Sequence, residues 1–173
     1  MFLTGKQIQN EVERGLIELD PFDPSKVGPN SYDVCLGPSF KRLLANQVLD
    51  TRSFNSETAY VDVPVVDGRV RLFPGELYLG HTAEVVGSDY YLPWYEGRSS
   101  FARMGVSIHV TAGVGQVGFK GQVVLEIQVV APTILYVGDR IAQVLFCEVV
   151  GERTLYKGSY QNQRGPRVAG NHL

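Results

Sequence analysis

A polar run near the middle of the chain contains the groups best suited to bind an anionic ligand. Gly97, Arg98, Ser99 and Ser100 combine a flexible glycine, a guanidinium and two hydroxyls, and Arg103 adds a second guanidinium. Backbone amides, hydroxyls and guanidinium groups are the donors that bind phosphate oxygens. The same residue types also make ordinary polar turns, so the run by itself leaves a phosphate site and a simple turn both open.

Glu126 is a downstream carboxylate that could act on a bound ligand. It lies in QVVLEIQV, residues 122–129. Val123 and every second residue after it are apolar, and they alternate with the positions that include Glu126. This two-residue period predicts a β-strand with Glu126 on the solvent face. If that face instead lined a cleft, burial could raise the pKa of the carboxyl group and suit it for general-base catalysis.

The composition and the missing motifs exclude several functional classes. A formal net charge of −2 with 20% charged residues does not fit a general nucleic-acid or membrane binder, which would carry a basic excess or a cationic amphipathic face. The sequence has no H-E-x-x-H, no H-x-E with P-C-x-x-C, no G-x-S-x-G and no G-x-x-x-x-G-K-[ST], and its histidines are widely spaced. Zinc, serine-hydrolase and P-loop chemistry are therefore not expected.

The cysteines and the N-terminal segment indicate an intracellular protein. Cys35 and Cys147 lie in apolar surroundings, far apart in the sequence, and are expected to be reduced. The N-terminal segment carries Lys6 and no uninterrupted apolar run, so neither a signal peptide nor a spanning helix is predicted. A soluble, cytoplasmic protein follows, located in the host cytoplasm if the source is a virus.

Short strands separated by turn residues dominate the predicted secondary structure. Thr4 and Gln7 form a capping-box pattern ahead of apolar residues that repeat every four positions, which predicts one short amphipathic helix closed near Gly15. Asp67 and Gly68, between VPVV and RVRL, predict a two-residue hairpin turn. Further strands are expected at 76–86, 91–95, 106–110, 122–130, 133–137 and 141–150. This series predicts a single β-sandwich or closed-barrel domain over residues 1–173.

Five segments, in order along the chain, carry a family resemblance. They are DPFDPSKVGPNSYDVCLGPSF at 20–40, PGELYLGHTAEVV at 74–86, EGRSSFARMGVSIHVTAGVGQVGFKGQVVLEI at 96–127, YVGDRIAQVLFCEV at 136–149 and YKGSYQNQRGP at 156–166. Together they resemble the dCTP deaminases, the zinc-independent branch of the trimeric dUTPase superfamily. The resemblance implies a mainly β subunit, a distorted β-barrel or jelly-roll of the dUTPase-like type, in a homotrimer with active sites between subunits.

The resemblance also implies the substrate and the catalytic residues. The substrate would be a nucleoside triphosphate with Mg²⁺ bound through the triphosphate, without a protein-bound metal and without a nucleic-acid or membrane partner. Glu126 matches the general base that activates water for attack on C4 of cytosine, and the carbonyl of Ala112 would hold that water. Ser99 and Arg103 would position the water and stabilise the tetrahedral intermediate. Without zinc, a carboxylate must take the proton of the water and pass one to the departing amine.

Substrate binding is implied for residues of three segments. They are Arg98, Ser99 and Ser100 at the phosphates, Thr111, Gly113 and Gln116 in the loop before Glu126, and Tyr156, Tyr160 and Gln163 in the tail. The basic segment 153–173 would otherwise be a mobile tail. Under the resemblance it becomes a mobile lid that folds over the nucleotide.

Two departures from the family pattern bear on the activity. Gln116 stands where family members have an aspartate, which in dUTPases and in bifunctional deaminases is tied to pyrophosphate release, and an amide cannot serve as a base there. Val114 and Gly115 would leave the pyrimidine loop smaller or more mobile, which would suit a 5-substituted cytosine.

Hydrolytic deamination of dCTP to dUTP and ammonia is the main prediction, with a 5-substituted deoxycytidine nucleotide as a variant of the substrate. Two alternatives stay open at this point. One is a dUTP or dCTP pyrophosphatase, alone or combined with deamination. The other is a catalytically silent trimer that binds nucleotide.

Overall fold

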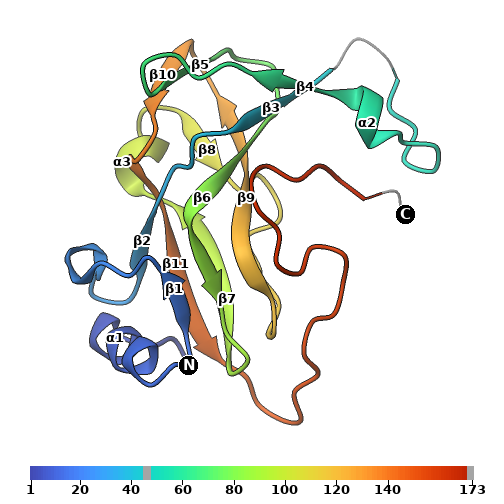
Figure 1. Ribbon diagram of the computed structural model, residues 1–173. Helices are drawn as coiled ribbons and strands as arrows, with labels where there is room; N and C mark the ends of the chain where they lie inside the picture. Colours follow the sequence, from blue (N-terminus) through green and yellow to red (C-terminus); the bar gives the residue numbers. More distant parts are fainter. Residues whose placement is uncertain (45–47, 171–173) are drawn as a thin grey trace.

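Antiparallel strands form the body of the protein, which a computed structural model describes for residues 1–44 and 48–170 (Figure 1). The largest sheet in this part of the chain has the order β4-β3-β6-β9-β8, and β1 pairs with β6 outside this path. Its strands are β1 Glu18–Asp20, β3 Phe40–Leu43, β4 Tyr60–Val63, β6 Tyr78–Gly87, β8 Val106–Ile108 and β9 Lys120–Val129.

Two smaller sheets complete this framework. The first has the order β2-β11-β7, with bounds Tyr32–Cys35, Arg140–Glu148 and Tyr91–Gly97. The second pairs β5 Arg69–Leu72 with β10 Thr133–Tyr136. The strands expected between residues 76 and 150 are present, with their ends shifted by a few residues, and RVRL forms β5. VPVV, the other expected arm of the hairpin, contributes only Val63 to β4 and an isolated bridge at Val66, and β1, β2 and β3 were not predicted. The predicted mainly β, jelly-roll fold is confirmed.

The predicted hairpin turn is present and has the expected backbone geometry. Val66 and Arg69 exchange two backbone hydrogen bonds, each 2.9 Å from nitrogen to oxygen, around Asp67 and Gly68. The φ angles of these two central residues are 50° and 71°. Positive φ at both central residues is the signature of a type I′ turn, whose twist matches that of the flanking strands.

The predicted N-terminal helix is α1, Gly5–Glu13, and it has only half of the expected capping box. Thr4 Oγ1 accepts the backbone N–H of Gln7 at 3.3 Å. The Gln7 side chain turns away from the cap and donates to Oε1 of Glu11 at 2.6 Å. Glu11 is buried and attracts this donor, which explains the difference from the pattern. Short helical turns that the sequence did not predict follow at η1 Pro24–Lys26, α2 Ser56–Ala59 and α3 Ser99–Ala102.

The core lies between the large sheet and the β2-β11-β7 sheet. Val123, Leu125, Ile127 and Val129 of β9 enter this core. The alternate residues of β9, including Glu126, are on its other face but are half-buried up to residue 126. The predicted facing of the strand is therefore correct, while its exposure to solvent is not.

The C-terminal segment explains this reduced exposure. In Figure 1 it turns back at the end of β11 and runs beside β9, and backbone bonds join Asn162 N to Lys120 O at 2.8 Å and Gln122 N to Gln163 O at 3.0 Å. Cys35 and Cys147 are both free thiols. No helix in the described part of the chain is long and apolar enough to cross a membrane.

Candidate active site

A cavity of about 440 Å³ lies where β9, the loop from His109 to Phe119 and the C-terminal segment meet. Residues from β9, this loop and the C-terminal segment line it, together with Tyr60, Leu77, Leu79 and Tyr95. Those that the sequence proposed as site residues are Ala112, Gln116, Glu126, Tyr156, Tyr160 and Gln163. The volume is within the usual range of small-molecule sites, about 300–1,000 Å³. The polar face of β9 therefore lines a cleft, which is the condition that Glu126 needs for a catalytic role.

Glu126 is held inside the cavity by a histidine that the sequence did not single out. Nδ1 of His109 lies 2.8 Å from Oε2 of Glu126, and the two side chains are 3% and 29% exposed. An ionised carboxylate only accepts hydrogen bonds, so we assign the histidine proton to Nδ1. The backbone at His109, with φ of 55°, directly follows β8 and bonds to the Glu126 carbonyl. The pairing of β8 with β9 thus brings the two side chains together.

Two tyrosines missed by the sequence also line the cavity. Burial raises the pKa of Tyr60, and the charge of Glu126 adds to this effect. Burial alone raises the pKa of Tyr95 well above its ordinary value. Both phenols therefore stay protonated at neutral pH and serve as neutral hydrogen-bonding groups. Neither lies in a recognisable motif, and only the long-range pairing of strands brings them near Glu126.

The C-terminal segment closes one side of the cavity through side-chain and backbone bonds. Tyr156 N donates to Val117 O at 2.8 Å. The Gln161 side chain bridges the Lys120 N–H and the Gly118 carbonyl, at 2.8 and 2.7 Å. Further along, Gln163 Nε2 donates to the Gln122 carbonyl at 2.9 Å. The segment predicted to act as a lid is therefore docked along β9 and its preceding loop.

The other proposed site residues lie away from this cavity. Ser99, Ser100 and Arg103 are exposed on or beside the single turn α3, and Thr111 and Gly113 also do not line the cavity. Figure 1 shows α3 and the C-terminal segment on opposite sides of the molecule. Within one chain, the predicted catalytic set is thus divided between two places.

The chain is similar to known proteins that are named dCTP deaminases. The model of the dCTP deaminase-like family matches residues 2–149. A protein of Clostridium beijerinckii named dCTP deaminase, dUMP-forming, is 41% identical over 166 residues, which cover 95% of this chain and 93% of the relative. A protein of the same name from Leptospira biflexa is 38% identical over 166 residues, with coverages of 95% and 92%. The chain belongs to the dCTP deaminase-like family.

A solved structure supports the same fold. The crystal structure of 2′-deoxycytidine 5′-triphosphate deaminase from Agrobacterium tumefaciens superimposes with a TM-score of 0.64 at 19% identity. The match covers 84% of this chain and 47% of that one, so this chain spans about half of its length. The names of the curated relatives specify dUMP as product, whereas the sequence of this chain predicts dUTP.

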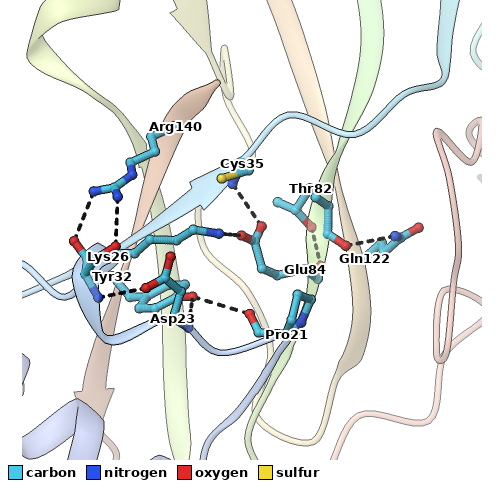
Figure 2. A network of polar contacts seen from close by, with 11 residues as sticks. Pro21, Asp23, Lys26, Tyr32, Cys35, Thr82, Glu84, Gln122 and Arg140 are labelled. Carbon is cyan, nitrogen blue, oxygen red and sulfur yellow. Dashed lines mark hydrogen bonds and ion pairs between the residues drawn. The ribbon is translucent and has the colours of Figure 1, made fainter. Parts of the chain in front are cut away.

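The family's N-terminal segment builds a buried polar network rather than part of the cavity (Figure 2). Nζ of Lys26 lies 2.7 Å from Oε1 of Glu84, whose Oε2 accepts the Cys35 N–H at 2.8 Å. Burial is the largest single effect on Lys26 and lowers its pKa, but the hydrogen bonds and charges of Glu84 and Cys35 together outweigh it and raise the lysine pKa. Arg140 donates to the carbonyl and hydroxyl oxygens of Ser25 at 3.0 and 2.9 Å. The network ties this segment to β6 and β11.

The same network reaches Arg98, which precedes α3. Its Nε lies 3.3 Å from Oδ1 of Asp33, and its Nη1 donates to the Arg140 carbonyl at 2.9 Å. Burial raises the pKa of Asp33, and the neighbouring guanidinium of Arg98 opposes this rise. One side of the Arg98 guanidinium is thus engaged within the chain, and this fixes the direction in which α3 begins.

The loop between Ala112 and Phe119 is bound to β7 by backbone hydrogen bonds. Tyr95 N donates to Gly113 O at 2.7 Å, and Gly115 N donates to Pro93 O at 2.8 Å. A Cβ at Gly115 would lie 2.7 Å from Cγ of Pro93, so this close packing requires glycine. Among residues 1–44 and 48–170, no three His, Cys, Asp or Glu side chains gather in a way that could hold a metal ion.

Proposed function

We propose that this protein deaminates dCTP hydrolytically, with Glu126 as the general base. The observation that carries the proposal is the Glu126 carboxylate, which lines a partly closed cavity and is oriented by Nδ1 of His109. The family supports the substrate, because the curated relatives that cover almost the whole chain are named dCTP deaminases. A half-buried, oriented carboxylate is also the group that metal-independent activation of water requires.

The proposed reaction replaces the amino group of cytosine by oxygen. Glu126 takes one proton from water while the water oxygen bonds to C4, and the carbonyl of Ala112 holds the attacking water. The protonated Glu126 then passes this proton to N4, the C4–N4 bond breaks, and ammonia leaves. The carboxylate is regenerated, the second water proton moves from the C4 hydroxyl to N3, and the pyrimidine becomes uracil, so no other reactant is consumed.

A second copy of the chain would complete the site. Ser99 and Arg103 are exposed on one side of the subunit, and Glu126 lines a cavity on another. We propose a homotrimer in which α3 of a neighbouring subunit meets the open side of this cavity. Its guanidinium and hydroxyl groups would bind the triphosphate, which brings its own Mg²⁺, and would offset the charge of the tetrahedral intermediate.

The C-terminal segment would act as the lid of this site. Tyr156, Tyr160 and Gln163 line the cavity from a segment without helix or strand that is held to β9 and its preceding loop by hydrogen bonds and by packing of the two tyrosines, and we propose that it opens for nucleotide exchange. The location remains the one that the sequence predicts, the cytoplasm.

We propose dUTP as the product, since Gln116 lines the cavity with an amide that cannot take a proton from a second water. The names of the curated relatives favour the other candidate, in which pyrophosphate is also released and dUMP is formed. The two differ in one measurable product. The purified protein is incubated with dCTP and Mg²⁺, and the nucleotides are separated by ion-exchange chromatography while ammonia is measured.

Release of ammonia together with dUTP is the expected result. Release of ammonia together with dUMP would instead identify the bifunctional reaction, in which deamination is combined with pyrophosphate release. If dCTP stays intact, the silent nucleotide-binding trimer becomes the function to test. Competition between dCTP and 5-methyl-dCTP in the same assay tests the 5-substituted substrate. Val114 and Gly115 line the cavity with small side chains, which would leave room for a substituent at C5. A clear preference for dCTP would reject that variant.

A further inference from the structure

Tyr95 has a buried hydroxyl group without a hydrogen-bond partner among the described residues. The residue is 3% exposed, lies on β7, and lines the cavity that contains Glu126. A buried tyrosine hydroxyl normally has a partner, because an unpaired polar group in a protein interior is unfavourable. The exception occurs in the wall of the proposed site, where a ligand can supply the partner.

The tyrosine ring is held in place, so its hydroxyl is already positioned. Its backbone N–H is bonded to Gly113 O at 2.7 Å, and its ring packs against that of His109 with 5.6 Å between the centroids. A Cβ at Gly115 would lie 3.1 Å from Cε2 of Tyr95, so the loop covers the ring closely. Because the phenol stays protonated, this hydroxyl can donate a hydrogen bond at any working pH.

Two more unpartnered atoms belong to residues that line the same cavity. Nε2 of His109 and Oε1 of Gln163 are buried and have no partner within residues 1–44 and 48–170. With the proton of His109 assigned to Nδ1, both atoms can accept a hydrogen bond from a ligand, and the Tyr95 hydroxyl can donate one to it. A cytosine edge offers an amino donor at N4 and acceptors at N3 and O2, and so requires both kinds of group.

We propose that the Tyr95 hydroxyl donates a hydrogen bond to an acceptor of the cytosine ring and positions the base in the cavity beside Glu126. This inference rests on the proposed function, because it assigns a specificity-determining residue to that same site. Tyr95 lies two residues before the Gly97–Ser100 run, yet its side chain lines the cavity of its own subunit.

The test is Tyr95→Phe, which keeps the ring and removes only the hydroxyl. We expect the melting temperature of the ligand-free protein to be unchanged or higher, because the lost hydroxyl has no partner in the folded chain. The dissociation constant and the KM for dCTP should rise roughly 3- to 10-fold, the equivalent of one neutral hydrogen bond. A lower melting temperature with an unchanged dissociation constant would overturn the proposal, and so would no change in either quantity.

Tyr32→Phe is the matched control. Tyr32 is also fully buried, but its hydroxyl accepts the Asp23 N–H at 3.0 Å and donates to the Pro21 carbonyl at 3.4 Å, outside the cavity. This variant should melt roughly 2–4 °C lower. Its dissociation constant for dCTP should equal that of the unsubstituted protein.

Failure of the proposed function gives a different pattern. Binding of dCTP, dUTP and dTTP is measured alongside ammonia release. If the unsubstituted protein binds these nucleotides without releasing ammonia, the deaminase assignment fails, and the dissociation constants of Tyr95→Phe still decide the role of Tyr95. If it binds none of them, both proposals are overturned.

Discussion

Gly118 is the residue at which a single methyl group should separate the C-terminal segment from the cavity. Its φ is +90°, and a Cβ there would lie 2.7 Å from the backbone nitrogen of Tyr156 and 2.7 Å from Cβ of Leu155. Gly118→Ala therefore introduces both an unfavourable backbone conformation and an overlap with the docked segment. Gly151→Ala is the matched control, since Gly151 has φ of +99° but no atom within 4 Å of its Cβ position.

The two substitutions share one cost and differ in the other. An alanine at positive φ costs about 1–3 kcal/mol at either site. Overlap with packed atoms costs a further amount of about 1–3 kcal/mol at Gly118 alone. If the overlap energy destabilises only the docked position of the C-terminal segment, the undocked population of the segment should be about 5- to 150-fold larger in Gly118→Ala than in Gly151→Ala.

Limited trypsin digestion measures that population. Lys157 and Arg164 lie within the segment, and cleavage there tracks the undocked fraction when docking is fast relative to cleavage. Cleavage of Gly118→Ala should be faster than that of Gly151→Ala by the stated factor, and its turnover of dCTP should be lower. Equal cleavage rates in the two variants would refute the reasoning, because the overlap would then have no effect on docking.

Two further predictions concern buried polar groups outside the cavity. Burial lowers the pKa of His81, so the free energy of unfolding should be highest above about pH 6.5 and fall by up to about 1.4 kcal/mol per pH unit below it. Urea titrations at pH 7, 6 and 5 should show a smaller decrease with falling pH in His81→Gln. An identical decrease in both proteins would show that His81 is not its cause. Lys26→Met leaves the Glu84 carboxylate, with its side chain 1% exposed, without its ion-pair partner, and should cost about 3–5 kcal/mol. Adding Glu84→Gln to Lys26→Met should recover part of the lost free energy of unfolding. Lys41→Met, which breaks a surface ion pair, should cost less than about 1 kcal/mol. Additive losses of unfolding free energy for the Lys26 and Glu84 substitutions would be inconsistent with a coupled buried pair.

Local patterns in the sequence were sufficient to predict the strands from β5 onward and the tight turn. Turn residues such as Asp67 and Gly68 act through their own backbone preferences, which do not depend on distant contacts. The alternation in β9 likewise predicted which face carries Glu126. It could not predict the half-burial of that face, because the covering segment begins about thirty residues later in the chain.

The site residues beyond the family motifs depend on tertiary structure. His109 meets Glu126 because β8 pairs with β9, and Tyr95 reaches the cavity because β7 pairs with the 113–115 loop. Neither residue differs in sequence from an ordinary strand residue. His109 lies inside the strand predicted at 106–110, and its polar side chain near the end of that strand was the available signal. The turn α3 was missed because four residues carry too little periodicity to indicate a helix.

The central claim is that the Glu126 carboxylate takes the proton from the attacking water. Glu126→Gln keeps the shape of the side chain and an oxygen that can accept from His109, and removes only the basic group. Ammonia release from dCTP and the dissociation constant for dCTP should be measured on the same preparation. We predict that turnover falls by at least about 100-fold while the dissociation constant changes little. Turnover equal to that of the unsubstituted protein would contradict the account.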